Sequence, residues 1–396
     1  MMYTETIKME SVITDIAAGP FGSNLKVSCF VDYGFPIIDG ANLKGFKVTD
    51  NVTKFVTEEK ARSLHRSIAQ RNDVIVTISG TLGQIAYIPE NSMFEEYLCS
   101  QRQFRVSFDT ERVFVPYLVY YFHSREGQHK ILSFANQTGV PALSQPLKNF
   151  RNIEVDLPDI DTQKQIASVM LSLDDKIELN TAINENLEQQ AQALFKNLIA
   201  DIQERVPFTS VIQVLGGGTP KTGKQEYWNG EIPFFTPKDV GAPYVLTTEK
   251  SITPLGLDNC NSRLYPVNTV FLTARGTVGK VSLAGVPMSM NQSCYALAGK
   301  DGLHQIIVYH YVLETVKALK HKASGAVFDA IITRDFDTES VPALSSEQID
   351  SFIAVAEPIY SDILNRTIEN QRLAALRDTL LPKLMNGEID VSAVQI

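Results

Sequence analysis

The pattern of hydrophobic and polar positions divides the chain into four segments that alternate between two kinds. Short β-branched runs separated by glycine and proline turns fill residues 1–157 and again 206–341. Such runs predict strands joined by tight turns. Residues 158–205 and 342–396 instead carry apolar side chains at alternating steps of three and four, which predicts long helices. We therefore expect an α+β protein, in which two lobes with mixed, twisted sheets alternate with two long helices.

Within the first lobe, the pattern predicts three strands and a helix, at Phe35–Ile38, Asp73–Ser79, Gln101–Val106 and Pro116–His129. The second lobe repeats this order, with its helix at Tyr309–His321. The repeat is also visible residue by residue. Asn-Asp-Val-Ile-Val-Thr-Ile-Ser-Gly-Thr-Leu-Gly, at 72–83, returns 196 positions later as Asn-Thr-Val-Phe-Leu-Thr-Ala-Arg-Gly-Thr-Val-Gly. A repeat of half the chain indicates two complete domains rather than a solenoid.

Each lobe is followed by a Pro-led helix, opened by Leu157-Pro158 and by Val341-Pro342. Two similar lobes joined by two similar helices can pack about a pseudo-two-fold axis. That symmetry suits a partner with paired sites at a fixed spacing, and duplex DNA is the commonest such partner.

The first long helix is expected from about 161 to 202, a rod of roughly 60 Å at 1.5 Å per residue. Its predicted seam combines apolar residues with two central asparagines, Asn180 and Asn184. The apolar positions are Ile166, Met170, Leu173, Ile177, Leu187, Ala191, Leu194 and Leu198.

The second long helix is expected from about 346 to 386, with N-cap chemistry at Ser345 and a stop at Gly387. Pro358 should kink it or move its start, and Pro382 should disturb its end. Thr367 and Asn370 are polar positions in the middle of its seam. The apolar seam consists of Ile349, Ile353, Ala356, Tyr360, Ile363, Leu373, Leu376, Leu380 and Leu384.

Two arrangements of these helices are open. They can zip into an antiparallel coiled coil whose polar central positions fix the register. Alternatively, each can pack separately on its own lobe. We favour the pair, because about 40 residues exceed what one lobe can cover. Deleting about seven residues from the first helix should then change the distance between the sites that the lobes bind.

Charge is distributed unevenly along a chain whose net charge is −9. Residues 1–156 carry a net −1 and residues 206–340 a net +1, whereas residues 157–205 carry −5 and 341–396 carry −4. The lobes can therefore present basic patches to phosphates, while the acidic helices suit protein partners.

Several kinds of chemistry are not expected. The stretch Gly218–Gln225 resembles a phosphate-binding P-loop, but it has glutamine where magnesium needs a hydroxyl ligand. The six histidines and four scattered cysteines show no metal-ligand spacing, so no metal site is expected. No apolar run is long enough for a membrane span, and no signal peptide is recognised. We therefore expect a cytoplasmic protein without catalytic residues of its own.

The chain resembles the specificity subunit of prokaryotic type I DNA restriction-modification systems over essentially its whole length. The resemblance rests on Gly19-Pro-Phe-Gly-Ser-Asn-Leu25, on Gly217-Gly-Thr-Pro220 with Tyr227-Trp228, on both Gly-Thr-x-Gly loops and on both Pro-led helices. The second helix ends with Leu381-Pro-Lys-Leu-Met-Asn-Gly-Glu-Ile389.

This resemblance implies two target-recognition domains, each reading one half of a bipartite DNA site. It also implies that the helices set the gap between half-sites and dock two methyltransferase subunits. Those subunits would methylate adenine N6 with S-adenosylmethionine, and restriction subunits would join through them and use ATP and Mg²⁺. No cofactor is expected in this chain itself.

Base edges and phosphates are contacted by Arg, Lys, Asn and Gln side chains. Our candidates for DNA binding are Lys26, Arg102, Arg105 and Lys130 in the first lobe, and Lys221, Lys224, Arg275 and Lys280 in the second. Two other readings are a duplicated scaffold that binds protein or glycan, and an enzyme such as a P-loop hydrolase or nuclease.

Overall fold

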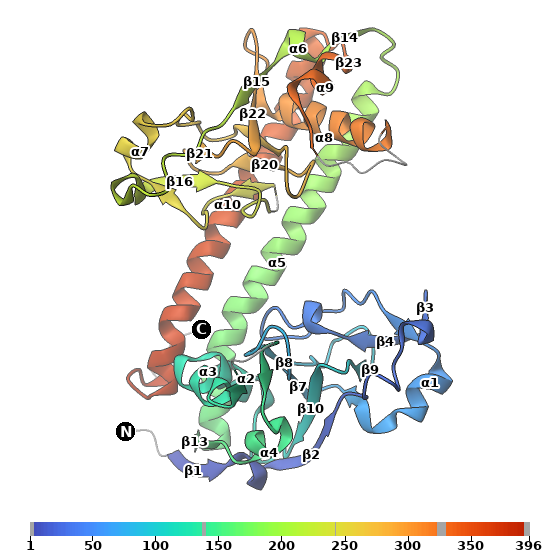
Figure 1. Ribbon diagram of the computed structural model, residues 1–396, viewed down its shortest axis with the longest axis vertical. Coiled ribbons are helices and arrows are strands. Elements are labelled where there is room, and N and C mark those ends of the chain that lie inside the picture. Colours follow the sequence, from blue (N-terminus) through green and yellow to red (C-terminus); the bar gives the residue numbers. More distant parts are fainter. Residues whose placement is uncertain (1–3, 137–139, 242, 323–329, 392–396) are drawn as a thin grey trace. The chain divides into compact units, whose positions relative to one another are not determined.

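The computed structural model describes residues 4–136, 140–241, 243–322 and 330–391. It divides into two compact units, of which the first combines Met1–Asp175 with Leu373–Ile396 and the second is Lys176–Arg372. Each unit thus contains one of the predicted lobes together with part of both long helices (Figure 1). The exact lobe boundaries at 157, 205 and 341 stay a prediction.

The first unit is built on a four-stranded antiparallel sheet in the order β2-β10-β7-β8. Its strands are Ile13–Ala18 (β2), Gln103–Phe108 (β10), Val74–Thr77 (β7) and Ile85–Tyr87 (β8). The predicted strand at 73–79 therefore forms in a shorter version, and the one at 101–106 begins two residues later. A five-stranded mixed sheet follows the order β3-β5-β4-β9-β6. It consists of Phe30–Val31 (β3), Phe55–Val56 (β5), Phe35–Ile38 (β4), Glu96–Cys99 (β9) and Ile68–Gln70 (β6).

Smaller elements complete this unit. Two-stranded ladders pair Thr4–Lys8 (β1) with Glu154–Pro158 (β13), and Ala135–Asn136 (β11) with Ala142–Leu143 (β12). The helices are Glu58–Ser63 (α1), Val115–His123 (α2), Arg125–Leu132 (α3) and Pro146–Arg151 (α4). The helix predicted at 116–129 is therefore two helices, since Ser124 leaves the helical backbone and caps α3 through the amide of Gly127.

The second unit repeats this plan. Its five-stranded sheet has the order β15-β22-β19-β20-β17. The strands are Ile212–Gly216 (β15), Cys294–Gly299 (β22), Val270–Thr273 (β19), Val281–Ala284 (β20) and Tyr244–Val245 (β17). A three-stranded sheet joins Ser251–Ile252 (β18), Trp228–Phe235 (β16) and Ser289–Met290 (β21).

The remaining elements of this unit surround the sheets. Arg205–Pro207 (β14) pairs with Ser340–Pro342 (β23). The helices are Phe208–Val211 (α6), Pro254–Asp258 (α7), Gln305–Lys322 (α8) and Thr333–Asp337 (α9). Short 3₁₀ helices interrupt the loops of the two units, at Met9–Ser11, Val27–Cys29, Gly40–Asn42, His65–Ser67 and Gln225–Tyr227.

The repeated segment forms the central strand of each unit, β7 or β19. Successive side chains of a strand point to opposite faces, and both faces of these strands are buried, which explains their continuous apolar sequence. In β7, Val74 and Val76 join the core that contains α2, whereas Ile75 faces the core under the second sheet. In β19, Val270 and Leu272 join the core that contains α8, and Phe271 faces the other core.

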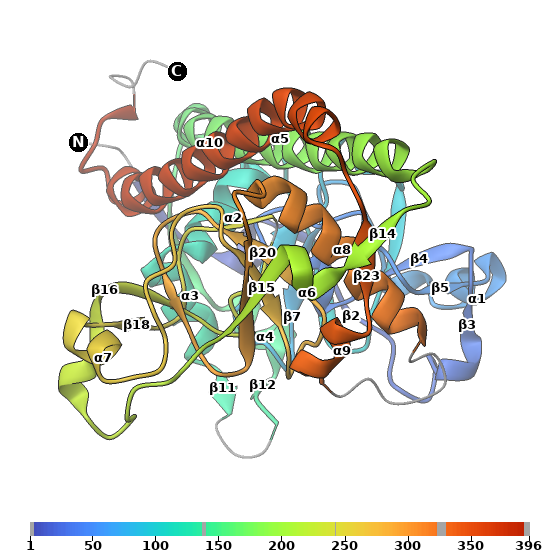
Figure 2. The ribbon, with the colours of Figure 1, turned by 90° about the horizontal axis from the view of Figure 1, so that it is seen from above.

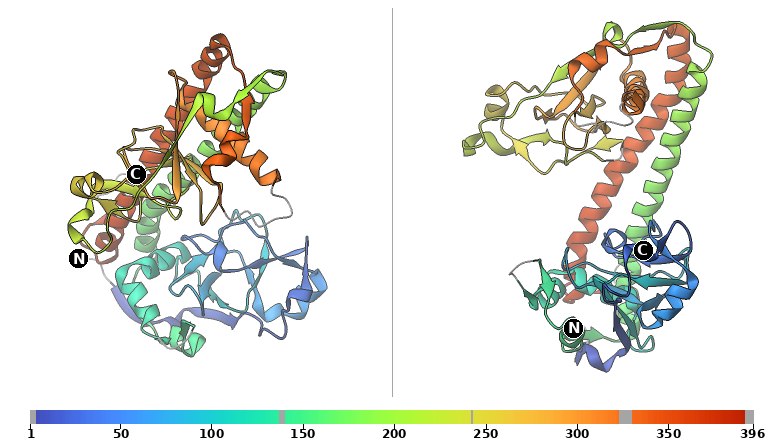
Figure 3. Two further views of the ribbon diagram at one scale, coloured as in Figure 1. Left: turned by 45° about the horizontal axis from the view of Figure 1, so that its top comes forward. Right: turned by 45° about the vertical axis from the view of Figure 1, so that its right-hand side comes forward.

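The long helices are Ile160–Ile199 (α5) and Ser346–Met385 (α10), close to the predicted ranges. In the first unit, Ile166 and Met170 of α5 share a core with Leu381 and Leu384 of α10. In the second unit, Ala191 and Phe195 of α5 pack in a core with Phe352, Ala356 and Tyr360 of α10. The start of α5 thus packs against the end of α10, and the end of α5 packs against the start of α10. The two helices are therefore antiparallel (Figures 1 and 3).

Pro358 and Pro382 both lie inside α10, which begins at Ser346, so Pro358 does not move the start of the helix. The kink predicted at Pro358 stays a prediction. Pro358 and Ala354, whose carbonyl loses its helical partner, are both on the exposed side of α10. Water can bind that carbonyl, and the helix continues.

The ends of α10 agree with the prediction. The hydroxyl of Ser345 accepts a hydrogen bond from the backbone amide of Gln348. In return, the side-chain oxygen of Gln348 accepts a hydrogen bond from the backbone amide of Ser345. Gly387 has a φ of 71° just after the last turn and ends the helix.

In each unit, one helix joins the central sheet to the long helices. Residues 115–122 of α2 are all buried, between the four-stranded sheet and α5. In the second unit α8 has this place, as Figure 2 shows, and its Tyr309 and Val312 share a core with Phe195 and Tyr360. Among the described residues, no helix is both long enough and apolar enough to span a membrane.

Candidate DNA interface

Three loops that are distant in the sequence meet in the first unit. They are the glycine loop after β2, the Gly80–Gly83 turn after β7, and the Ser100–Arg102 turn before β10. The amide of Gly19 donates to the Gln103 carbonyl at 2.8 Å, and the amide of Ile78 donates to the Arg102 carbonyl at 2.7 Å. A Cβ at Gly19 would lie 1.8 Å from the Ser100 carbonyl oxygen, so only glycine fits there.

The second unit brings the equivalent loops together in the same way. The amide of Ala274, at the end of β19, donates to the Ser293 carbonyl at 2.8 Å. A Cβ at Gly217 would lie 2.1 Å from the Asn291 carbonyl oxygen. The hydroxyl of Thr219 contacts the side-chain oxygen of Gln292. The motifs that carry the family resemblance therefore gather in one place in each unit.

The Gly-Thr-x-Gly turns have matching backbones. Gly80 and Gly83 have φ values of 99° and 86°, and Gly276 and Gly279 have 81° and 73°. These left-handed conformations favour glycine. Each turn is also tied to a helix. Gln128 Nε2 of α3 donates to the Gly83 carbonyl at 2.9 Å, and Lys320 Nζ of α8 donates to the Gly279 carbonyl at 2.8 Å.

A groove of about 530 Å³ lies along the three loops of the first unit. Its polar lining includes Thr81, Gln101 and Arg102, and an ion pair between Lys54 and Asp39 at 2.6 Å. Gln103 also lines it, and its buried Nε2 has no hydrogen-bond acceptor among the described residues. Such a concave surface, lined by donors and acceptors, can accept the edges of bases.

The four basic candidates of the first unit have different environments. Lys26 and Arg102 are exposed, and Arg102 lies on the groove. Arg105, by contrast, is buried in β10, where it pairs with Asp15 and lies 3.8 Å from Asp73. Lys130 Nζ donates to the hydroxyl of Tyr121 at 2.7 Å and to the Glu154 carbonyl at 2.8 Å. These contacts hold Arg105 and Lys130 within the fold, which favours a structural role for both.

The four candidates of the second unit are all exposed. Arg275 and Lys280 flank the Gly276–Gly279 turn, whereas Lys221 and Lys224 lie on the loop after β15. Lys224 Nζ is 5.0 Å from the ring centre of Tyr227 and 3.6 Å from Glu226. The contact with the Tyr227 hydroxyl raises the pKa of the Lys224 amine. The contact of any of these residues with DNA stays a prediction.

Sequence reasoning missed Gln101 and Gln292, which precede β10 and β22 at equivalent places. Both come two residues before the first residue of their strand, and both lie beside the glycine loop. A glutamine can bind adenine through both its oxygen and its nitrogen. The only sequence signal was that each glutamine lies two residues before its strand. The segments around β10 and β22 match too weakly in sequence for this correspondence to be recognised.

The seam between the long helices differs from the predicted one at two positions. Leu194 is 41% exposed, while Phe195, the next residue, is 1% exposed and faces α10. The reason is that the next seam position after Ala191 comes four residues later, at Phe195, and not three residues later. Leu376 is 47% exposed, because Arg377 turns inward at that level. The other predicted positions, Ile166, Met170, Leu173, Ile177, Leu187, Ile353, Tyr360, Ile363 and Leu380, are buried or half-buried.

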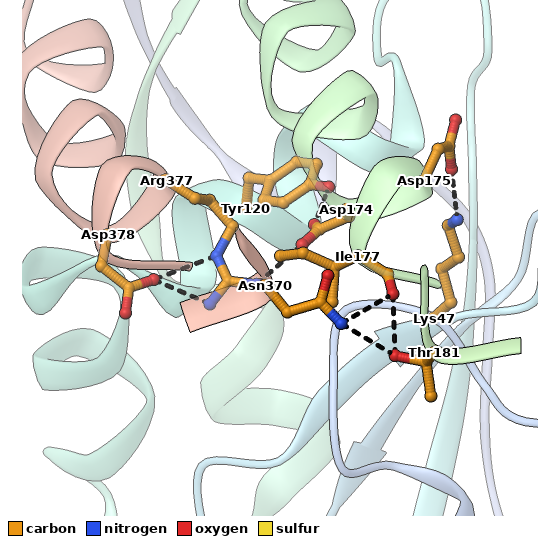
Figure 4. Close-up of polar contacts among 9 residues, drawn as sticks. All are labelled: Lys47, Tyr120, Asp174, Asp175, Ile177, Thr181, Asn370, Arg377 and Asp378. Carbon is orange, nitrogen blue, oxygen red and sulfur yellow. Dashed lines mark hydrogen bonds and ion pairs between the residues drawn. The ribbon is translucent and has the colours of Figure 1, made fainter. Parts of the chain in front are cut away.

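Arg377 binds across the helix pair in the first unit, as Figure 4 shows. Its Nη1 donates to Asp174 Oδ1 at 2.7 Å, and its Nη2 donates to Asp378 at 2.8 Å. The hydroxyl of Tyr120 donates to the other oxygen of Asp174. Burial and the neighbouring Asp174 carboxylate raise the pKa of Tyr120, so the phenol keeps its proton. The network connects α2, α5 and α10.

The polar central positions of the helices meet in the second unit. Asn180 Nδ2 donates to Asn370 Oδ1 at 2.9 Å and to Glu369 at 2.7 Å. Arg366 donates to Asn180 Oδ1 at 3.2 Å. Asn370 Nδ2 in turn lies 3.4 Å from the Ile177 carbonyl and 3.3 Å from the Thr181 hydroxyl (Figure 4). These contacts pair the helices in a single register.

Within the described residues, no three His, Cys, Asp or Glu side chains gather in a way that could hold a metal ion. The P-loop-like stretch at 218–225 leads into a 3₁₀ turn at Gln225–Tyr227 and β16. A phosphate-binding P-loop would instead lead into a helix whose N-terminus faces the phosphate. This geometry gives no support to a nucleotide site at Lys224.

Comparison with known proteins gives a consistent result. The model of the type I restriction modification DNA specificity domain matches residues 22–189 and again 204–352. The chain is 24% identical, over 318 residues, to the type I restriction enzyme HindI specificity subunit of Haemophilus influenzae, a match that covers 60% of this chain and 69% of that subunit. It is 30% identical, over 166 residues, to the MjaIX specificity subunit of Methanocaldococcus jannaschii, with 41% and 38% covered.

The fold is also similar to a solved structure. The S subunit of a type I restriction-modification system from M. genitalium superposes with a TM-score of 0.60 at 14% identity, with 97% of this chain and 96% of that chain covered. The predicted α+β fold, with two similar domains and two long helices, is confirmed.

Proposed function

This chain belongs to the family of type I restriction-modification DNA specificity domains, and on that basis we propose that it selects the DNA site of such a system. Each domain reads one half of a bipartite site through its glycine loop, its Gly-Thr-x-Gly turn and the turn before β10 or β22. The observation that carries this proposal is the duplicated meeting of these loops around Arg102 in one unit and Arg275 in the other. The two surfaces differ in sequence, so the half-sites differ too.

The long helices form the spacer and the docking surface for partner subunits in this proposal. Segments 157–205 and 341–396 together hold the acidic excess of the chain, so phosphates repel them. They also expose the apolar side chains of Leu179, Leu194, Val355 and Leu376. Exposed apolar side chains on an acidic, paired helix surface suit a protein partner.

The partner chains supply the chemistry. Two methyltransferase subunits bind S-adenosylmethionine and methylate adenine N6, and restriction subunits use ATP and Mg²⁺. This chain contributes recognition and no catalytic group. Family membership gives no support to a duplicated scaffold that binds protein or glycan without DNA.

The test is selection from a random duplex library by the chain in complex with its methyltransferase partner. We expect a bipartite, asymmetric sequence with a constant gap. The affinity for that sequence should fall steeply with salt, because bound Lys and Arg side chains release counterions from the phosphates. Equal binding to all duplexes, or no binding at low salt, would contradict the proposal.

A further inference from the structure

The loops of the two units correspond residue by residue around one backbone hydrogen bond. Ile78 donates to the Arg102 carbonyl in the first unit, and Ala274 donates to the Ser293 carbonyl in the second. The residue that follows Ile78 or Ala274 forms an isolated β-bridge to an alanine. Ser79 pairs with Ala142, and Arg275 pairs with Ala330. Position 78 therefore corresponds to 274, position 79 to 275, and position 102 to 293.

An arginine and a serine have changed places at this point. In the first unit, serine follows the central strand and arginine precedes β10 at position 102. In the second unit, Arg275 follows the central strand and Ser293 precedes β22. Each unit thus keeps one arginine beside its Gly-Thr-x-Gly turn, although the two arginines occupy different positions of the repeat.

Both arginines are placed to contact a ligand. Their side chains are exposed, and neither forms an ion pair with a carboxylate in the part of the chain that the structure describes. Nη1 of Arg102 would lie 3.9 Å from a Cβ at Gly80, so its guanidinium lies beside the turn, and Arg102 lines the groove. The turn is itself fixed by Gln128 in the first unit and by Lys320 in the second.

We propose that Arg102 and Arg275 are the guanine-reading residues of the two half-sites, one in each domain. A guanidinium can donate two parallel hydrogen bonds to O6 and N7 of guanine in the major groove, and no other base offers that pair of acceptors. The inference rests on the proposed function, because it names the base that each reading surface recognises. It follows from the position of each arginine beside a rigid turn, where a fork of donors can be aimed.

A contact with phosphate makes a different prediction. A phosphate contact lowers the affinity for all sequences about equally and reduces the salt slope by about one. A base contact changes the preference at one position and leaves the rest of the site as it was. The two roles can therefore be separated by sequence selection at several salt concentrations.

The experiment is selection from a random duplex library with the chain in complex with its methyltransferase partner. For Arg102→Ala, we expect the preference for guanine at one position of one half-site to fall by roughly 5- to 150-fold, the range for one bidentate contact. Arg275→Ala should do the same in the other half-site. Arg102→Lys should weaken the preference, since an ammonium lacks the planar fork of donors, while keeping the salt slope.

The design contains its own controls. The half-site that a variant does not touch reports whether the complex is folded. Arg125→Ala removes an exposed arginine at the start of α3 and should leave every base preference unchanged. A uniform loss of affinity, an effect of both variants on the same half-site, or an unchanged guanine preference would overturn the inference. A wild-type complex that selects no bipartite sequence would remove the proposed function as well.

Discussion

Replacement of Arg377 should destabilise contacts of helices other than its own, because its partner Asp174 also binds Tyr120 of α2. Its side chain is 18% exposed and that of Asp174 is 9% exposed, so water screens their attraction only in part. Arg377→Ala would leave the Asp174 carboxylate without its cation. We expect a loss of about 2–3 kcal/mol in the stability of the first unit, between the values for exposed and for fully buried pairs.

Hydrogen exchange of the α2 amides measures this loss, because Tyr120 of α2 binds the same carboxylate. Asp378→Ala is the matched control. It removes the partner that is 65% exposed and should cost less than about 1 kcal/mol. Equal effects of the two variants would contradict the structural role of the buried pair.

His310 gives the second unit a dependence on pH. Its ring stacks on Phe195 with 4.7 Å between ring centres, and Nε2 lies 3.1 Å from the Tyr360 hydroxyl. Burial lowers the pKa of His310 to about 3. An unfolded histidine has a pKa near 6.5, so between these values the unfolded chain binds the additional proton.

Stability should therefore be complete above about pH 6.5 and fall by up to about 1.4 kcal/mol per pH unit below it. Fluorescence of Trp228, the only tryptophan of the chain, reports denaturant unfolding of this unit. His310→Gln should flatten the pH dependence between pH 7 and 5, and His321→Gln, an exposed control, should not. An unchanged slope in His310→Gln would contradict this assignment.

The sequence predicts single residues well only where the backbone decides their role. Gly387 as the end of a helix follows from its freedom to adopt positive φ. Arg102 and Arg105, in contrast, look alike in the sequence. They separate only when β2 and β7 pair with β10 and bring Asp15 and Asp73 to Arg105. The residues next to Arg102 and Arg105 in the sequence do not reveal which strands pair with β10. The different environments of these two arginines could therefore not be predicted.

At the level of elements, the paired asparagines of the long helices should fix their register. Asn180→Leu alone leaves Asn370 Oδ1 without its donor and Arg366 without one of its acceptors, and we expect a cost of about 1–3 kcal/mol. Asn370→Leu alone should cost a similar amount. The double variant should recover part of the loss, because two leucines can pack together, with a coupling energy of roughly 0.5–3 kcal/mol.

Denaturant unfolding followed by Trp228 fluorescence gives the four stabilities of this cycle. Gln190→Leu, on the exposed side of α5, is the control and should change little. Strictly additive costs would show that the two asparagines do not act together. If the register depends on them, the double variant should also bind sites with more than one gap between the half-sites.

The long helices were predictable because a regular apolar pattern over 40 residues overrides local signals. That pattern placed α5 and α10 to within a few residues. The pattern failed at Leu194, because the next seam position after Ala191 comes four residues later. It also failed at Leu376, because Arg377 faces inward at that level. Pro358 does not move the start of α10, because Pro358 and Ala354 lie on the exposed side of the helix, where water can bind the free carbonyl.

For the whole molecule, pairing of the helices changes how the spacer should be shortened. Removing seven residues from α5 alone would leave its partner without facing residues. Removing seven from each helix at facing levels, 178–184 and 364–370, keeps the pairing of the remaining turns. The pair becomes shorter by about 10.5 Å, equivalent to at most about three base pairs at 3.4 Å each.

We expect this double deletion to reduce the mean gap between half-sites while the bases read stay the same. Because the deletion also removes Asn180 and Asn370, more than one gap should be accepted, as in the double leucine variant. Library selection with the methyltransferase complex measures both quantities. The deletion in α5 alone is the comparison and should lower the yield of folded complex. A change in the bases read, with an unchanged gap, would contradict the division of roles between domains and helices.

The duplication of the chain was evident from the sequence, and so was the content of each domain. The reading surfaces were not, because each is assembled from three loops that are far apart along the chain. Gly19 could be recognised as special, but only the structure shows that Ser100 is the neighbour that requires it.

The first compact unit is completed by residues that lie far from the rest of the unit along the chain. Leu381 and Leu384 complete a core whose other fully buried members all come before residue 176. During synthesis, this unit can therefore be completed only after residues 176–372 have been made, whereas the second unit is one continuous stretch and can form earlier. A chain that ended before α10 would leave the apolar side chains of Ile166 and Met170 without the leucines that cover them.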